Sequence, residues 1–230
     1  NIKNVKVDYF HELSNCRLQL SYNIYGNGMV KLKQTLYPSG SNLPELPRFG
    51  MKTTIPSSFN SLEWFGRGPH ESYWDRKSSA RIDRFAGKVW DQTFKYVRPQ
   101  ETGNKTDVRW MAMYNGSVGI MAKGIPFFDG SVHHYNYANL YHAKGSQLHG
   151  AIDIKKENQI DWLIDFKQMG VGGDNSWGAK PHKKYTLPMD TSTYSLEYVL
   201  IPFSQKNQLE ELARINLDDY VKLITEDWWT

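Results

Sequence analysis

Alternation of apolar and polar residues is the feature that most constrains the fold of this chain. In residues 16–24 the apolar positions are Cys16, Leu18, Leu20, Tyr22 and Ile24, and polar residues separate them. A Gly-Asn-Gly turn follows at residues 26–28, and the alternation resumes over residues 30–36. A period of two is the repeat of a β-strand with one buried face. A glycine turn between two such runs predicts a β-hairpin.

Runs of the same kind recur along the chain, at residues 5–9, 117–123, 159–166 and 194–201. Segments rich in proline and glycine separate them, as at residues 43–47 and 66–69. Many short strands with turn signals between them predict an all-β fold, a large antiparallel β-sandwich. Aromatic residues make up 14% of the chain, and most of them are expected to fill the core of that sandwich.

The C-terminal tail departs from this pattern. Ser204 is a suitable N-cap for a helix in which Leu209, Leu212 and Ala213 lie on one face, and residues 217–224 suggest a second helical turn or two. We therefore divide the chain into a sandwich over residues 1–204 and a short helical extension over residues 205–230.

Composition excludes several classes of protein. The apolar content of 40% excludes disorder, and the lone Cys16 excludes an internal disulfide framework and any zinc site built from cysteines. No run approaches the ~20 apolar residues of a membrane helix. The net charge of +4 is not gathered into the basic stripe of a nucleic-acid binder. The first residues resemble the start of an excised piece rather than a signal peptide, so the compartment stays open between cytoplasm and periplasm.

The first stretch that suggests chemistry is residues 62–76. Glu71 and Asp75 are four residues apart and are candidates for the acid–base pair that glycoside hydrolysis requires. Arg67 and Arg76 lie among them, however, and carboxylates interleaved with arginines form ionised structural pairs. The structural interpretation is the favoured one.

The second stretch is the glycine-rich segment at residues 170–178. It lacks the Gly-Lys-Ser/Thr of a phosphate loop, and Pro181 stands where a helix would follow. Its glycines and its Asp174-Asn175-Ser176 run favour a sharply bent loop that carries Trp177. An exposed indole there can lie against the apolar face of a sugar, with Asp174 or Asn175 in reach of hydroxyl groups; the alternative is a Trp177 folded back into the core.

The third stretch is rich in histidine. His133 and His134 are adjacent, so on a strand they point to opposite faces and cannot bind one metal ion together. His142 and His149 follow without a recognised metal-binding spacing. We expect hydrogen-bonded imidazoles rather than a metal site.

Five motifs together resemble one known family. They are LPRFG at residues 46–50, WFGRGPHESY at 64–73, DR at 75–76, YVRPQETG at 96–103 and GVGGDNSW at 170–177. In this order and at this spacing they resemble the C-terminal small-chain domain of family 2 β-galactosidases, over most of the chain, from about Arg17 to Phe203.

The resemblance implies more than the patterns do. It implies a galactose-mutarotase-like supersandwich, an N-terminally truncated small-chain domain, and no catalytic or metal-binding residue on this chain. The catalytic glutamates and the magnesium and sodium sites belong to a TIM barrel that would precede it. The family's substrate-stacking tryptophan corresponds to Trp177, with Asp174 and Asn175 beside it as candidate substrate contacts.

The partners implied by the resemblance are a galactoside and the preceding barrel and sandwich domains; a homo-oligomer is allowed. Two other functions stay open at this point. The first is a galactoside-binding module that acts without a barrel. The second is an aldose 1-epimerase, for which His133, His142 and Glu101 are the available residues.

Overall fold

The structure is a computed structural model that describes residues 4–13, 15–40, 42–97, 100–141, 154–175, 177–190 and 192–216. The described residues contain ten strands and one α-helix. The strands are β1 (Asn4–Leu13), β2 (Cys16–Tyr25), β3 (Val30–Pro38), β4 (Arg48–Pro56), β5 (Ser61–Gly68), β6 (Arg81–Lys88), β7 (Lys105–Asn115), β8 (Val118–His133), β9 (Gln159–Gln168) and β10 (Tyr194–Phe203). The helix is α1 (Gln208–Arg214), and three short 3-10 turns are η1 (Trp90–Gln92), η2 (Tyr137–Tyr141) and η4 (Lys183–Tyr185).

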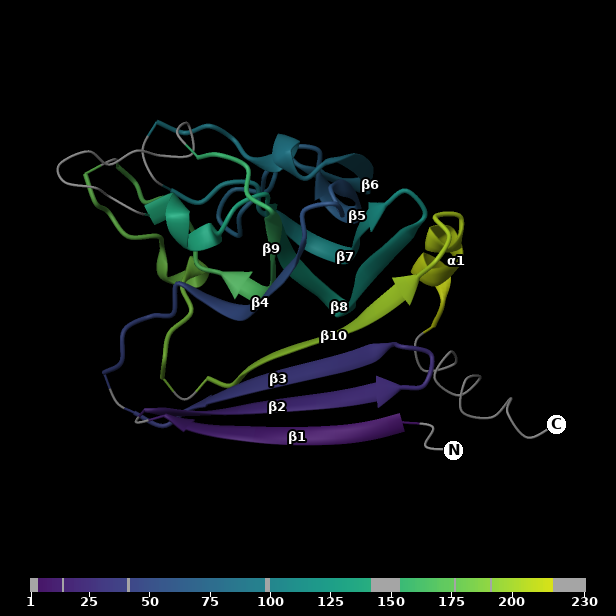
Figure 1. Ribbon diagram of the computed structural model, residues 1–230. Helices are drawn as coiled ribbons and strands as arrows, with labels where there is room; N and C mark the ends of the chain where they lie inside the picture. The colour runs from purple at the N-terminus through teal and green to yellow at the C-terminus, as the bar shows by residue number, and fades with distance from the viewer. Residues whose placement is uncertain are drawn as a thin grey trace.

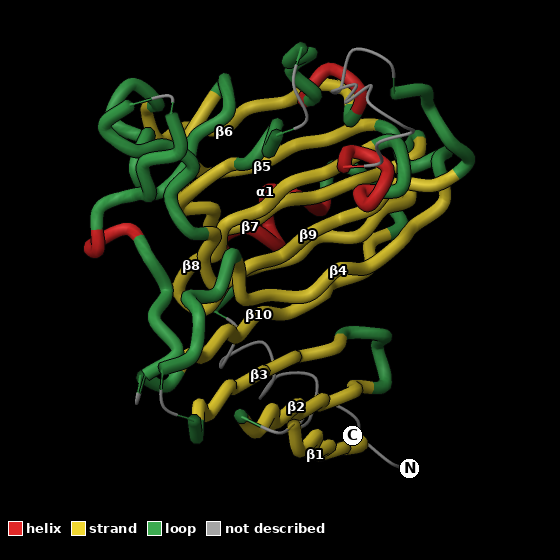
Figure 2. Tube along the Cα trace, turned by 90° about the vertical axis from the view of Figure 1, so that its left-hand side faces the viewer, coloured by secondary structure: helices red, strands yellow, loops and turns green. Residues whose placement is uncertain are grey.

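All pairs of described strands are antiparallel, which confirms the all-β prediction. The main path runs β1-β2-β3-β10-β8-β7-β5-β6, and β4 pairs with β9, which pairs in turn with β8. Strand β8 makes this branch because β7 pairs with it as far as Gly130, whereas on its other edge residues 119–124 pair with β10 and residues 129–133 pair with β9. Figure 2 shows the strands stacked from β1 at the bottom to β6 at the top.

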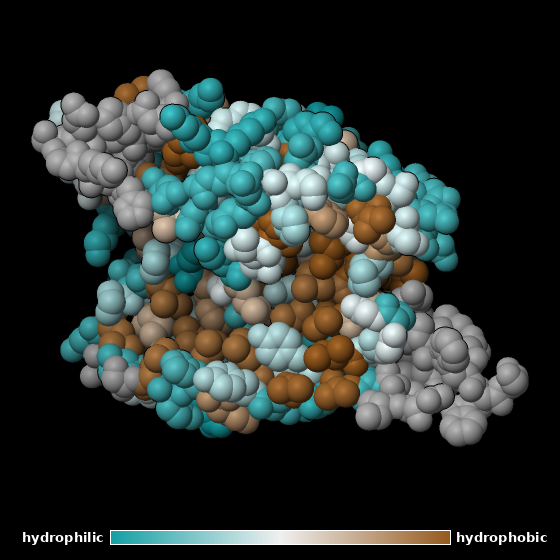
Figure 3. All heavy atoms as spheres, viewed as in Figure 1, coloured by the Kyte–Doolittle hydropathy of each residue, from teal (hydrophilic) through white to brown (hydrophobic). Residues whose placement is uncertain are grey.

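The predicted hairpin is β2 and β3, with Ile24 opposite Val30. Gly28 takes a φ of +85°, a left-handed conformation that glycine adopts without strain. The apolar face of this hairpin is less buried than the alternation predicts: Leu18 and Tyr22 are half-buried and Ile24 is exposed. In Figure 3 apolar residues gather in a band between β1, β2 and β3 below and the strands above them.

Two apolar clusters form the core, one on each face of the sheet. The larger one lies between the main sheet and the β4–β9 pair and contains Trp64 and Trp162. The second lies on the opposite face of β7, β8 and β10 and includes Leu209 and Leu212 of α1. Figure 1 shows α1 beside the ends of β8 and β10. The chain is therefore a layered antiparallel sandwich, as predicted.

Strand β9 differs from the prediction in one respect. Its apolar side chains Ile160, Trp162 and Ile164 are buried as expected, but Asp161 and Asp165 on the opposite face are buried as well. That face is covered by polar groups of other segments: Lys52 and Thr54 of β4 both donate to Asp161, each at 3.0 Å. Alternation identified the strand, but not that both of its faces are enclosed.

The tail helix begins later than predicted. Ser204 does not cap it; the side-chain Oε1 of Gln208 accepts hydrogen bonds from the backbone N–H groups of Ser204 and Gln205 at 3.1 and 3.0 Å. Leu209 and Leu212 are buried, as the spacing indicates. The second helical stretch, expected over residues 217–224, lies outside the described residues.

Candidate functional site

The glycine-rich segment after β9 is a loop held at several points. Gly170 donates its N–H to the carbonyl of Tyr185 at 2.8 Å, and Gly172 donates to Asp75 Oδ2 at 3.0 Å. At Gly173 a Cβ atom would lie 2.2 Å from the carbonyl oxygen of Ala179, so any larger residue would push the two arms of the loop apart. The predicted bent loop is thus fixed on the sandwich by its backbone.

The loop presents Trp177 to solvent. Its side chain is 90% exposed, which excludes the alternative of an indole folded into the core. The backbone N–H of Trp177 donates to Asn175 Oδ1 at 2.8 Å, and Asp174 Oδ1 lies 2.7 Å from His182 Nε2. The three predicted site residues therefore share one loop, where Asn175 shapes the turn and Asp174 pairs with the basic segment that comes after it. Ser176 lies outside the described residues.

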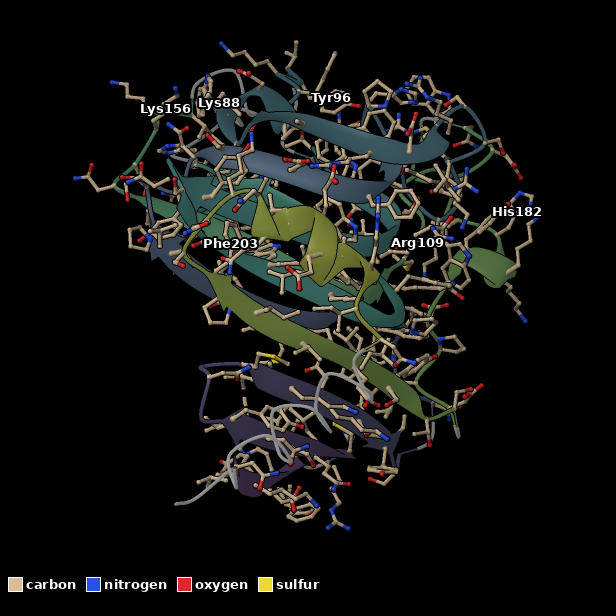
Figure 4. The ribbon with its side chains drawn as sticks, turned by 90° about the vertical axis from the view of Figure 1, so that its right-hand side faces the viewer. Lys88, Tyr96, Arg109, Lys156, His182 and Phe203 are labelled. Carbon is tan, nitrogen blue, oxygen red and sulfur yellow. The ribbon has the colours of Figure 1, made fainter. Side chains whose placement is uncertain are left out.

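A pocket of about 980 Å³ lies beside this loop. Residues 170–174 of the loop form one wall, whereas Trp177 and Asn175 do not line it. Figure 4, which labels Tyr96 and His182 of the lining, shows both on the half of the molecule away from β1, β2 and β3. The other lining residues that matter chemically are Arg48, Arg76, Glu101, Tyr137 and Gln168.

Arg48 of β4 organises one side of the pocket. Its Nη2 donates to Gln168 Oε1 at 2.7 Å and to Glu101 Oε2 at 3.3 Å, and its Nε lies 3.6 Å from Asp165 Oδ2. Tyr137 donates its hydroxyl to Glu101 Oε1, and the Arg48 guanidinium lies 5.1 Å from the centre of the Tyr137 ring. The sequence motifs contain both Arg48 and Glu101, but they do not assign the two residues to a common site.

On the other side of the pocket, Glu71 holds the lining residues Arg76 and Tyr96, although it does not line the pocket itself. It accepts hydrogen bonds from the Tyr96 hydroxyl, from Arg76 Nη2 at 2.8 Å and from the Gly103 N–H at 2.8 Å. Tyr73 is buried next to it, and burial together with the Glu71 charge raises the pKa of the Tyr73 hydroxyl. Glu71 is therefore a structural centre that holds several segments together.

The proposed acid–base pair of Glu71 and Asp75 is not supported by these contacts. Glu71 binds Arg76 and Gly103, whereas Asp75 binds the glycine-rich loop. Arg67 pairs with Asp107 at 2.6 Å, and the hydrogen bonds from Arg67 and Lys77 lower the pKa of Asp107 against the effect of burial. The ion-paired interpretation of this stretch is the one that the geometry supports.

Of the predicted hydrogen-bonded imidazoles, His133 fits the expectation, whereas the buried Nδ1 of His134 has no hydrogen-bond partner among the described residues. His133 is fully buried, with Nδ1 at 3.0 Å from the Tyr135 hydroxyl and Nε2 at 3.2 Å from the Ser131 hydroxyl. Burial lowers the pKa of His133 to about 3, so its imidazole is neutral at pH 7. His142 and His149 lie outside the described residues.

Within the described parts of the chain, no three His, Cys, Asp or Glu side chains come together as a metal site requires. No helix among those residues is long and apolar enough to cross a lipid bilayer.

Comparison with known proteins gives consistent matches. Residues 1–200 match the family model of the beta galactosidase small chain. A β-galactosidase of Priestia megaterium is 38% identical over 200 residues, which cover 85% of this chain and 19% of that protein. A β-galactosidase of Vibrio cholerae is 33% identical over 194 residues, covering 84% of this chain and 18% of the relative. The chain thus spans about one fifth of the length of these curated relatives.

Among solved structures, a galactose 1-epimerase from Lactobacillus acidophilus aligns with a TM-score of 0.39 and 10% sequence identity, over 89% of this chain and 64% of that one.

Proposed function

The chain belongs to the family of β-galactosidase small chains, and we propose that it is the C-terminal domain of a retaining β-galactosidase, which hydrolyses terminal β-galactosides. In that enzyme the domain supplies Trp177 as one wall of the substrate pocket and contacts the preceding domains. Hydrolysis proceeds by double displacement through a covalent galactosyl intermediate. The two catalytic glutamates, and the magnesium and sodium ions that the family resemblance implies, belong to the barrel domain and not to this chain.

One observation carries the proposal: Trp177 is 90% exposed at the tip of a loop that is anchored on both sides. A large aromatic side chain that is left in water on an anchored loop suits a surface that a ligand covers. The Trp177 indole presents an apolar face for the C–H groups of a sugar ring. Stacking of this kind adds about 1 kcal/mol to binding.

The test is Trp177→Ala in the complete enzyme that contains this chain. We expect kcat/KM for lactose and for 4-nitrophenyl β-galactoside to fall by about fivefold, mainly through KM, since about 1 kcal/mol corresponds to that factor. The free energy of unfolding is expected to change by less than about 0.5 kcal/mol because the side chain is exposed. Tyr9→Ala, which removes another exposed aromatic side chain on β1, is the control and leaves kcat/KM unchanged. An unaltered kcat/KM in the Trp177 variant would show that the indole does not contact substrate.

The binding-module alternative is favoured by one observation, the pocket of about 980 Å³ on this chain itself. It predicts that the isolated chain binds lactose tightly. One wall of a shared site predicts millimolar affinity or weaker. Titration of the purified chain with lactose and with galactose separates the two functions.

A further inference from the structure

Strand β1 is the exposed end of the main sheet. All ten of its residues are exposed, and among the described strands it pairs only with β2. Figure 2 shows β1 at the lower end of the stack of strands, with β2 on one side of it. An edge strand presents a row of backbone N–H and C=O groups to any chain that can pair with them. We propose that β1 pairs antiparallel with β1 of a second copy of this chain, so that the two sheets join into one.

One face of β1 is apolar, and this face continues onto β2. Val5, Val7, Tyr9 and Leu13 alternate along the strand and are 44–53% exposed. Ile24 of β2 lies opposite Val5 and is exposed as well. Single exposed apolar residues are common, but a contiguous patch of them marks an interaction surface. The strand therefore offers a partner both free backbone groups and apolar side chains.

The other end of the main sheet is protected against such pairing. Strand β6 carries four charged residues among its eight: Arg81, Asp83, Arg84 and Lys88. Charged side chains along an edge discourage association with another strand, as do proline residues and β-bulges. Strand β1 contains no proline, and it pairs with β2 over ten consecutive residues without a register shift. Its charged residues alternate with the apolar ones and so lie on the opposite face of the strand.

A second copy fits this edge because β1 is complementary to itself. Two copies related by a two-fold axis along the sheet normal pair so that each contact occurs twice. With Tyr9 on the axis, Lys6 lies opposite Glu12 of the second copy, and Val5 lies opposite Leu13. This register pairs residues 5–13, nine of the ten residues of the strand. It matches opposite charges on one face and apolar residues on the other, and both kinds of cross-strand pair stabilise an antiparallel ladder.

The neighbouring registers fit less well. With Asp8 on the axis two carboxylates meet, and with Phe10 on the axis Asp8 lies opposite Glu12; like charges opposite one another destabilise a strand pair. With Val7 on the axis Lys6 lies opposite Asp8, but only seven of the ten residues pair. Lys6 and Glu12 each have an exposed ion pair within the chain, at 3.0 and 3.1 Å, and exposed pairs of this kind rearrange at little cost.

Sedimentation equilibrium of the purified 230-residue chain measures the association. We expect dimers at a chain concentration of about 100 µM, since one pair of strands makes a small interface. Val7→Lys places a charge on the apolar face of β1 and should raise the dissociation constant by at least about tenfold. Ile82→Lys is the matched control. Ile82 is an exposed apolar residue of β6, the other end of the main sheet, and its replacement should leave the dissociation constant unchanged.

Disulfide cross-linking tests the register. Residues that face each other in an antiparallel pair have Cα atoms about 4.5–5.5 Å apart, which a disulfide can span. Tyr9→Cys should therefore give a covalent dimer when the chain is oxidised with copper phenanthroline. In Val5→Cys the two new thiols would lie ~27 Å apart, eight residues along the strand, and no covalent dimer is expected. The wild-type chain is a second control, because its lone Cys16 is buried.

The outcomes decide the proposal without reference to the proposed function, because β1 contributes no residue to the pocket beside the glycine-rich loop. A dimer that Val7→Lys weakens and that Tyr9→Cys cross-links supports the pairing of two β1 strands. A chain that stays monomeric at about 100 µM overturns it, and the edge is then left to another occupant, such as a segment of the complete enzyme. A dimer that Val7→Lys leaves intact, or that Val5→Cys cross-links as readily as Tyr9→Cys, also contradicts the proposal.

Discussion

Asp129 and Asp165 face each other across β8 and β9, and both are buried. Burial raises the pKa of Asp129 to about 7, and the charge of Asp165 adds to this effect. Burial also raises the pKa of Asp165 to about 7, although Arg48 acts in the opposite direction. Because an unfolded aspartate titrates near pH 4, the folded state holds protons between pH about 4 and about 7 that the unfolded state has released. The stabilisation from this pair is complete at low pH and is lost as the pH rises through about 7.

Asp129→Asn tests that effect. The variant lacks one of the two titrating groups, so its free energy of unfolding should fall less than that of the wild type between pH about 5 and about 7.5. The expected difference is at least about 1 kcal/mol, since one pKa unit corresponds to ~1.4 kcal/mol. Urea unfolding at the two pH values measures it. Asp83→Asn on the exposed edge of β6 is the control, and its free energy of unfolding should depend on pH as that of the wild type does. If the two variants showed the same altered pH dependence, the effect could not be assigned to the buried pair of Asp129 and Asp165.

At the level of single residues, the sequence predicted the features that depend on neighbours in the chain. Trp177 was identified because the glycines that expose it are adjacent to it. The cluster of Arg48, Glu101 and Gln168 was not identified, because its members come from three segments. Arg48 and Glu101 are 53 residues apart, and Arg48 and Gln168 are 120 residues apart. No local pattern records such a meeting. The register of β4 and β9 places Arg48 opposite Gln168, and Glu101 reaches Arg48 from the segment before β7.

At the level of elements, the contact between Asp75 and the glycine-rich loop joins two motifs that the sequence treats separately. Asp75 Oδ2 accepts the Gly172 N–H at 3.0 Å, and a Cβ on Gly170 would lie 2.8 Å from the Asp75 carboxyl carbon. The close approach requires glycine at 170 and a short acidic side chain at 75. The loop that carries Trp177 is therefore positioned by the segment at residues 66–76.

A double-mutant cycle checks this positioning role in the complete enzyme. Asp75→Ala should raise KM for lactose, because the loop is no longer held, and Asp75→Ala combined with Trp177→Ala should cost less than the sum of the two. We expect a coupling energy of about 0.5–1 kcal/mol. The exposed Asp83→Ala provides the control and should be additive with Trp177→Ala. Strict additivity for Asp75 would mean that the loop keeps its position without the carboxylate.

Helix α1 was expected from its apolar spacing, but the residue that fixes its end was not. Lys123 of β8 donates from Nζ to the carbonyls of Leu212, Ala213 and Ile215 at 3.2, 2.8 and 2.5 Å. Leu212 and Ala213 belong to the last turn of the helix and Ile215 is its C-cap, where backbone carbonyls have no partner within the helix. A lysine near a helix C-terminus also interacts favourably with the helix dipole.

Lys123→Met keeps the length of the side chain and removes its hydrogen bonds. It should lower the free energy of unfolding by about 1–3 kcal/mol, the cost of leaving buried polar groups without their charged partner. Chemical denaturation measures the change. Lys88→Met, which removes an exposed contact to Ser61 at 2.9 Å, is the control and should cost less than about 0.5 kcal/mol. Equal effects of the two substitutions would show that α1 does not depend on Lys123.

At the scale of the whole molecule, alternation predicted the fold class because each antiparallel strand carries its own buried face. It did not predict the branch at β8, where one strand of 16 residues pairs with three others. That branch brings the β4–β9 pair over the main sheet and so creates both the larger core and the pocket beside it. The Asp residues of β9 look like a solvent face in the sequence because nothing local records this second layer.

The last prediction concerns the chain by itself. The purified 230-residue chain should neither release nitrophenol from 4-nitrophenyl β-galactoside nor speed the mutarotation of α-galactose. Retaining hydrolysis needs two carboxyl groups about 5–5.5 Å apart across the sugar bond, one of them protonated. Glu101 of the pocket and Glu71 behind it are instead ion-paired with arginines, and Asp174 Oδ1 lies 2.7 Å from His182 Nε2. Mutarotation needs an accessible acid and base, and His133 is buried with both ring nitrogens in hydrogen bonds. Absorbance and polarimetry, beside a mock purification from galactosidase-deficient cells, measure the two reactions. Mutarotation that His133→Asn abolishes would make the chain an epimerase, and hydrolysis above the mock level would place catalytic carboxylates on it.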